Sequence, residues 1–142
     1  MRKNIARAGT EDSVAALTRA VSRFITEREW GPYHDPKNLS MGVAIEAAEL
    51  MEHFQWESSE ASHKKVRDPE WREDVEDEIA DVAIFTLRFA EITGIDLGAA
   101  ILRKLKKNAR KYPLELVRGR NFKYTYYRKL ARLESRRRAG RG

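Results

Sequence analysis

The stretch LSMGVAIEAAELMEHFQ (residues 39–55) decides the fold of this chain. Its apolar residues recur at helical spacing, and two acids three residues apart, Glu46 and Glu49, stand inside that pattern. A second pair with the same spacing, Glu78 and Asp81, lies in another apolar helical pattern. Because residues i and i+3 project from one helix face, each helix presents two carboxylates side by side. Four carboxylates that face one another repel unless a hard divalent cation neutralises them, so the two pairs predict a Mg²⁺ site.

Helical periodicity extends over most of the chain, and the fold class that it predicts is all-α. Four helices are expected: from about Thr10 to Glu29, from Leu39 to Gln55, from Asp68-Pro69 to Gly94, and from the cap residue Asp96 to just before Pro113. Two prolines in Gly31–Pro36 exclude helix there. The polar segment Glu57–Arg67 is expected to be a loop, and Phe122–Tyr127 is ambiguous between strand and other structure.

The apolar positions of these segments predict the core. The side chains expected inside are Val14, Leu17, Val21, Phe24 and Ile25; Met41, Ala44, Ile45, Ala48 and Met51; Trp71, Val75, Ile79, Val82 and Phe89; and Leu97, Ile101 and Leu105.

Composition fits one folded domain, because the chain has 142 residues and 42% hydrophobic side chains. The absence of cysteine excludes disulfides and thiolate metal sites. No apolar run has the length of a membrane span, and the N-terminus lacks the apolar segment of a secretory signal. We therefore expect a cytoplasmic protein with no membrane partner.

The formal net charge of +6 is unevenly distributed along the sequence. Residues 128–142 hold seven Arg/Lys and one Glu, whereas residues 1–127 hold 21 basic and 21 acidic side chains. We therefore divide the chain into a domain, residues 1–127, and a basic C-terminal tail, residues 128–142. A solvated extension is favoured over a nucleic-acid contact, because the rest of the chain offers no second basic face.

Both acidic stripes lead to aromatic residues within about two helical turns. The stripes are Glu46, Glu49, His53 and Trp56, and Asp74, Glu78, Asp81 and Phe85. An acidic cleft with aromatic walls suits a planar ring carrying a metal-bound polyphosphate. Simpler interpretations remain open: Glu78 and Asp81 as part of a solvated acidic face, Trp30 and Tyr33 as core aromatics, and Lys104 and Asn108 as solvated side chains.

The order of motifs resembles the all-α NTP pyrophosphatase (MazG-like) superfamily, in its dCTP pyrophosphatase branch. The resemblance covers roughly residues 12–125, and it is carried by a series of blocks. These are Phe24-x-x-Glu27-Arg28-Glu29-Trp30, Tyr33-His34-x-Pro36-Lys37-Asn38-Leu39, Glu46-x-x-Glu49, Phe54-Gln55-Trp56, Glu78-x-x-Asp81-Val82, Gly94-Ile95-Asp96-Leu97, Lys104 through Asn108 to Lys111-Tyr112-Pro113, Arg118-Gly119 and Lys123-Tyr124-Thr125.

The resemblance implies a four-helix MazG-like bundle, assembled as an oligomer built on dimers and often a tetramer. It implies Mg²⁺-dependent cleavage of a nucleoside triphosphate, with dCTP or a related pyrimidine dNTP as substrate, to the monophosphate and pyrophosphate. The implied metal ligands are Glu46, Glu49, Glu78 and Asp81. As a mechanistic hypothesis, we take Glu49 as the catalytic carboxylate that helps to deprotonate the attacking water. By the same resemblance, Trp30 and His34, with Trp56, would frame the base and sugar, and Lys104, Asn108 and Arg118 would meet the phosphates. Asn38 and Phe85 are further expected substrate-binding residues.

Two departures from the branch bear on specificity. Phe85 occupies a position that is commonly tyrosine, and Val21 one where some members have histidine. Both weaken a strict preference for dCTP, so a broad-specificity house-cleaning dNTP pyrophosphatase is the alternative within enzymes. Outside enzymes, the alternatives are a helical nucleic-acid-binding protein that uses the basic tail, with nucleic acid less favoured as a partner, and a purely structural oligomerising bundle.

Overall fold

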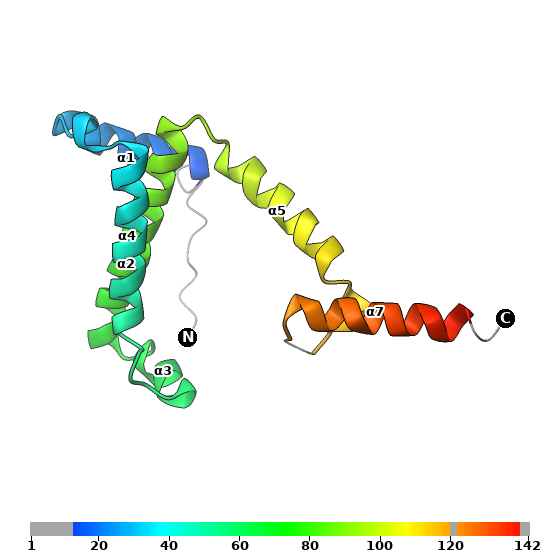
Figure 1. The fold of residues 1–142 in the computed structure, drawn as a ribbon. Coiled ribbons are helices and arrows are strands. Elements are labelled where there is room, and N and C mark those ends of the chain that lie inside the picture. The colour runs from blue at the N-terminus through cyan, green and yellow to red at the C-terminus, as the bar shows by residue number, and fades with distance from the viewer. Residues whose placement is uncertain (1–12, 120–121, 140–142) are drawn as a thin grey trace. The chain divides into compact units, whose positions relative to one another are not determined.

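The computed structural model describes residues 13–119 and 122–139, and every regular element within these residues is a helix. In chain order the elements are α1 (Val14–Glu27), the 3₁₀ turn η2 (Gly31–Tyr33), α2 (Pro36–Glu52), α3 (Ser59–Lys65), α4 (Pro69–Ile92), α5 (Leu97–Lys111), α6 (Leu114–Val117) and α7 (Tyr124–Ala139), shown in Figure 1. The prediction of an all-α fold is therefore confirmed. None of the described helices is long and apolar enough to cross a bilayer.

Short polar side chains start the helices of the first half. Ser13, Asp35 and Asp68 each accept a hydrogen bond from a backbone N–H in the first turn of α1, α2 and α4, respectively. Such caps satisfy donors that the helix itself leaves free. The predicted start of α4 at Asp68-Pro69 is confirmed, whereas the cap expected at Thr10 lies outside the described residues.

Two local predictions were wrong. Pro36 does not exclude helix but begins α2, because a proline at the first helical position loses no intrahelical hydrogen bond. The segment expected to be a loop between Glu57 and Arg67 contains α3, which Ser58 caps through Ala61 N and which a Glu60–Lys64 pair at 2.8 Å supports.

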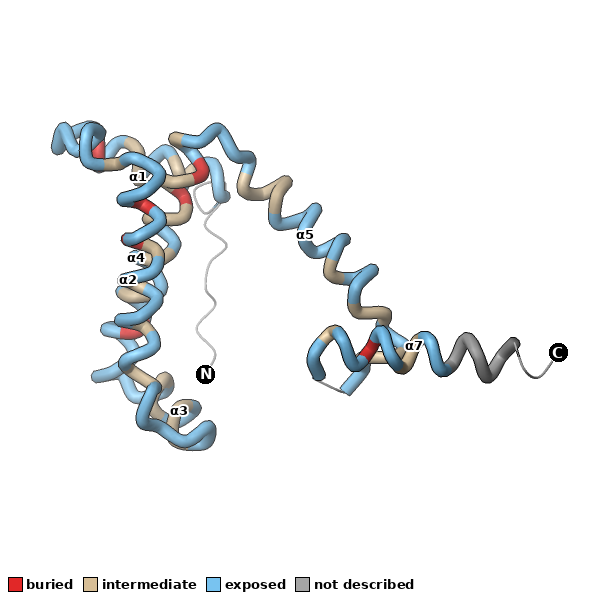
Figure 2. Tube along the Cα trace, viewed as in Figure 1, coloured by how far each residue is buried: buried red, intermediate tan, exposed pale blue. Residues whose placement is uncertain are grey.

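The chain forms two compact units, Met1–Leu97 and Gly98–Gly142. In the first unit α4 returns alongside α2, and α1 packs against α4 (Figure 1). Its buried apolar side chains are Ile25, Leu39, Val75, Leu87 and Ala90 (Figure 2).

Helices α2 and α4 approach closely at Gly42. A Cβ added at Gly42 would lie 2.6 Å from Cδ1 of Phe85, so only glycine allows this packing of the Phe85 ring. This close approach packs the Phe85 ring of α4 directly against Gly42 of α2.

Much of the predicted core is exposed in the single chain. Met41, Ile45 and Met51 on α2 are 54%, 52% and 57% exposed, and Ile79 on α4 is 52% exposed. The residues that α2 buries are instead Leu39 and Gly42. The apolar face of α2 is thus wider than the strip that α4 covers.

The second unit is built around Tyr127, which is 3% exposed. The rings of Tyr112, Phe122 and Tyr126 surround it at centroid distances of 5.9–6.3 Å. The backbone N–H of Phe122 donates to the Tyr127 hydroxyl at 3.0 Å. The ambiguous segment Phe122–Tyr127 therefore leads into α7. Helix α7 continues past residue 127, and the division into domain and tail at that residue stays a prediction.

Charge divides between the two units. Residues 1–97 carry 12 basic and 20 acidic side chains, and residues 98–142 carry 16 basic and two acidic ones. The basic excess already begins in α5, where Arg103, Lys104, Lys106, Lys107 and Arg110 surround a shallow hollow. Residues 1–127 carry no net charge only because the acidic excess of the first unit offsets this basic stretch.

Candidate metal centre and adjoining pocket

Helices α2 and α4 bring three of the predicted acids together. Carboxylate oxygens of Glu46, Glu49 and Glu78 all lie within 4.8 Å of one another. Glu46 and Glu78 are half-buried, whereas Glu49 is exposed. The i, i+3 spacing on α2 and the packing of α4 beside it are sufficient to produce the cluster.

The cluster concentrates negative charge that the described residues do not neutralise. Burial raises the pKa of the Glu46 carboxyl, and the charges of Glu49, Asp81 and Glu78 raise it further. A divalent cation would remove this repulsion, and three hard oxygen donors at this spacing have the chemistry that Mg²⁺ or a similar ion requires. The residues present therefore fit the metal that the sequence predicts.

Asp81 has a different position from the other three acids. Its charge acts on Glu46, but its side chain is not within the 4.8 Å group and lies at one end of a neighbouring pocket. Asp81 thus connects the acidic cluster with that pocket.

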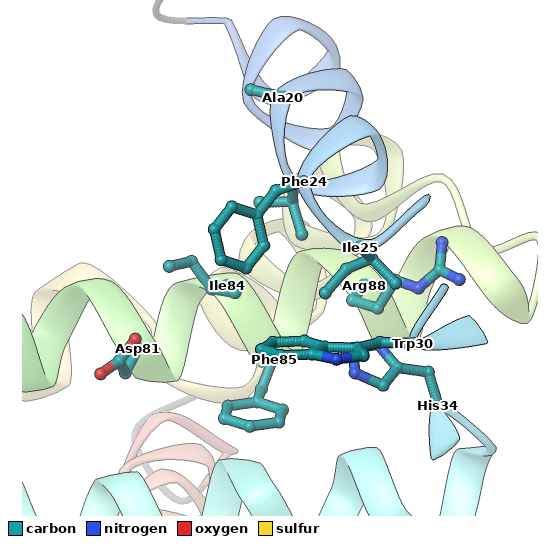
Figure 3. A pocket seen from close by; sticks show the side chains of 10 residues that line it. Ala20, Phe24, Ile25, Trp30, His34, Asp81, Ile84, Phe85 and Arg88 are labelled. Carbon is teal, nitrogen blue, oxygen red and sulfur yellow. The ribbon is translucent and has the colours of Figure 1, made fainter. Parts of the chain in front are cut away.

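The pocket has a volume of about 390 Å³ and a lining that is mostly apolar. Helix α1, the turn after it and helix α4 supply its lining residues: Ala20, Val21, Phe24, Ile25, Trp30, His34, Asp81, Ile84, Phe85 and Arg88. Figure 3 shows Asp81 at one end of the pocket and His34 and Arg88 at the other. Phe24 and Trp30 meet edge to face at a centroid distance of 5.9 Å.

A tight turn presents Trp30 and His34 to the pocket. Glu29 adopts a left-handed conformation with φ 55°, and the Trp30 N–H donates to Ile25 O at 3.1 Å. The Asn38 side-chain amide donates to Tyr33 O at 3.1 Å, and this bond ties the turn to the start of α2. Asn38 therefore braces the turn here, and its predicted contact with substrate stays a prediction.

Other predicted site residues are not among those that line this pocket. Trp56 follows α2 and is 88% exposed. Lys104 and Asn108 on α5, and Arg118 after α6, belong to the second unit. Only the family resemblance assigned these residues to one site, and their part in a site stays a prediction.

Arg88 is a pocket residue that was not predicted from the sequence. It lies seven residues after Asp81, two helical turns along the same face of α4, but this spacing alone does not distinguish it from a solvated arginine. Its Nη1 donates to Glu91 Oε2 at 2.6 Å. Burial lowers the pKa of His34, and the positive charge of Arg88 lowers it further.

Comparison with known proteins agrees with this geometry. The MazG-like family matches residues 42–125, which include both acidic pairs. The chain belongs to the MazG-like family.

Relatives of this MazG-like chain extend over most of its length. dCTP pyrophosphatase 1 of Bos taurus is 34% identical over 116 residues, which are 82% of this chain and 69% of that protein. The Homo sapiens protein of the same name is 33% identical over 115 residues, 81% of this chain and 68% of that protein. A crystal structure of a pyrophosphatase from Archaeoglobus fulgidus aligns with a TM-score of 0.65 at 40% identity, covering 70% of this chain and 91% of that one.

These relatives confirm the family that the sequence motifs predicted, and with it the enzyme class. The MazG-like chain is a nucleotide pyrophosphohydrolase. An acidic cluster beside an aromatic pocket is the arrangement that such a reaction needs, because one part of the substrate is a polyanion and the other a planar base.

Proposed function

We propose that this protein hydrolyses a pyrimidine deoxynucleoside triphosphate, dCTP or a close relative, to the monophosphate and pyrophosphate, and that it does so with Mg²⁺. The observation that carries the proposal is the continuity, through Asp81, of the carboxylate cluster with a pocket lined by Trp30 and Phe85. The names of the curated relatives support the choice of dCTP.

Glu46, Glu49 and Glu78 would hold the metal, with Asp81 completing the set from the pocket side. Bound there, Mg²⁺ would supply positive charge against the triphosphate as the bond to the leaving pyrophosphate breaks.

The side chains of the chain itself have two further tasks. Trp30 and Phe85 offer ring surfaces that hold the base and exclude water from it. Glu49 is the exposed member of the cluster, so it is the carboxylate that a water molecule can reach, and we assign it the role of proton acceptor from the attacking water.

The remaining predicted contacts belong to a larger assembly. We propose that the four-helix bundle is completed in a homo-oligomer, a dimer of dimers, in which Trp56, Lys104, Asn108 and Arg118 reach a substrate. The exposed apolar side chains of α2 support this assembly, since soluble proteins rarely leave a wide apolar face uncovered. A cytoplasmic location stays a prediction.

The decisive experiment incubates purified protein with normal and modified nucleoside triphosphates and Mg²⁺, and identifies the products by chromatography. Monophosphate and pyrophosphate are expected, with the highest kcat/KM for pyrimidine dNTPs. Glu49→Gln should reduce kcat at least about 100-fold, the contribution of general-base catalysis. Glu52→Gln, at an exposed position of the same helix outside the cluster, is the control. Equal turnover of the two variants would reject the role of Glu49.

Broad specificity is the second candidate function. Phe85 has no hydroxyl, and the pocket lining is mostly apolar, so few groups in it can hydrogen-bond a base. Comparable kcat/KM values across the panel would favour this alternative over a dCTP enzyme. Deletion of residues 128–142 separates both from a nucleic-acid-binding protein, because an enzyme keeps turnover whereas the binder loses salt-dependent affinity.

A further inference from the structure

Two polar atoms in the candidate pocket are buried without a hydrogen-bond partner among the described residues: His34 Nδ1 and Arg88 Nε. Both residues line the same pocket. Buried polar groups in folded proteins are nearly always hydrogen-bonded, so two exceptions side by side require an explanation. A ligand in the pocket that reached either atom would supply the missing partner.

Arg88 is held in place rather than free to turn away. Its side chain is 14% exposed, and its Nη1 donates to Glu91 Oε2 at 2.6 Å, which also balances the guanidinium charge. A guanidinium is planar, so fixing one terminal nitrogen restricts the direction of the Nε–H. The guanidinium plane therefore holds the Nε–H in a restricted orientation, and Arg88 lines one end of the pocket.

The position of Arg88 along α4 matches the length of a nucleoside. Arg88 follows Asp81 by seven residues, about 10 Å along the helix axis. Asp81 lies at the acidic end, where the phosphates would bind, and Phe85 lies between the two. A nucleoside that extends from the acidic cluster over Phe85 would bring the far edge of its base to Arg88.

We propose that Arg88 is a specificity-determining residue whose Nε–H donates a hydrogen bond to an acceptor on the base, a ring nitrogen or carbonyl oxygen of a pyrimidine. This inference rests on the proposed function of the pocket. His34 lies beside Arg88 and supplies a second polar group to the same edge of the base. Burial, and then the positive charge of Arg88, keep the pKa of His34 below its ordinary value, so the imidazole is neutral near pH 7.

The test compares dCTP with deoxyribose 5′-triphosphate, which has the same phosphates and sugar but no base. Arg88→Met removes the donor while keeping an unbranched side chain. Toward dCTP its kcat/KM should fall about 10- to 100-fold, chiefly through KM, the expected loss of one hydrogen bond from a charged donor. Toward the abasic compound the variant and the natural protein should differ less than about threefold.

Arg72→Met is the matched control, since Arg72 lies on the same helix and pairs with Glu76 at 2.6 Å but is 62% exposed. It should leave both substrates unaffected. Arg88→Lys keeps the charge and loses the Nε–H, so it should resemble Arg88→Met toward dCTP. An equal loss on both substrates would mean that Arg88 only supports the fold, and an unchanged KM for dCTP would also overturn the inference.

A binding measurement separates this inference from the reaction itself. The Arg88 Nε–H resonance, assigned through Arg88→Lys, should shift when deoxycytidine 5′-monophosphate is added to the natural protein. An unshifted resonance at saturation would show that the atom is only hydrated, and the inference would fail. Absence of pyrophosphate release from every nucleotide would instead reject the proposed function, while the titration would still decide the role of Arg88.

Discussion

Gly42 links the packing of α2 against α4 to the shape of the pocket. A methyl group at this position would lie 2.6 Å from two atoms of the Phe85 ring, which lines the pocket. Gly42→Ala should therefore displace Phe85 and reduce the free energy of unfolding. The expected strain of about 1–3 kcal/mol exceeds the gain in helix propensity of about 1 kcal/mol.

Urea unfolding measures that change, and KM for dCTP reports on the displaced ring. Gly31→Ala is the control, because nothing lies within 4 Å of a Cβ added at Gly31. A Gly42→Ala protein as stable as the natural one would show that α2 and α4 separate easily at this point.

His34 should make stability depend on pH in a defined direction. Burial and the charge of Arg88 lower its pKa in the folded state below the ordinary value of 6.5. As pH falls through 6.5, His34 is therefore protonated in the unfolded chain while it is still neutral in the folded chain. The free energy of unfolding should decrease in this window and level off once pH is below the folded-state pKa.

Urea unfolding of the natural protein and of His34→Gln, compared at several pH values between 5 and 8, measures the contribution of His34. The ordinary histidine pKa sets this pH window. The stability of the natural protein relative to the variant should decrease toward low pH. The exposed His63 on α3 provides the control variant, His63→Gln. A constant difference across the range would contradict the assigned environment of His34.

At the scale of elements, the acidic pairs were predictable and their surroundings only partly so. The spacing in Glu46-Ala-Ala-Glu49 and Glu78-Ile-Ala-Asp81 fixes which side chains share a helix face. It does not fix the register of α2 against α4, which places Glu78 in the cluster and Asp81 toward the pocket. Arg88 escaped prediction because periodicity alone cannot tell a charged residue at a pocket end from one in solvent.

Substitution of Glu46 in the metal cluster should have opposite effects on stability with and without Mg²⁺. Because the pKa of Glu46 is raised, its carboxyl binds a proton more readily in the folded state than in the unfolded state. The stability of the metal-free protein therefore falls as pH rises and the Glu46 carboxyl ionises. At neutral pH, Glu46→Gln should thus melt above the natural protein in EDTA. In saturating Mg²⁺ the order should reverse, since a cation that binds the folded state stabilises it by mass action.

Thermal unfolding in both buffers measures this reversal. Glu52→Gln, on the same helix but outside the cluster, should follow the natural protein in EDTA and in Mg²⁺. If Mg²⁺ raised the melting temperature of Glu46→Gln as much as that of the natural protein, Glu46 would not be a ligand.

At the scale of the whole molecule, the sequence indicated which faces are apolar but not what covers them. Leu39 and Val75 are buried within the chain, whereas Met41, Ile45 and Met51 show the same helical pattern and are about half exposed. Propensity and periodicity are properties of one helix, and burial depends on its neighbours. A face left exposed in one chain is an expected place for a second copy.

Met41→Lys should therefore shift the proposed oligomer toward smaller species while α2 remains helical. Met41 is 54% exposed in the single chain, and a charge there would be buried without a partner in an apolar interface. Light scattering at several concentrations measures the mass, and circular dichroism checks the helix content. Ser40→Lys, at the neighbouring exposed position, is the control and should keep the natural mass. If the natural protein is monomeric at every concentration, a second copy does not cover the exposed apolar face of α2, and the proposed assembly is wrong.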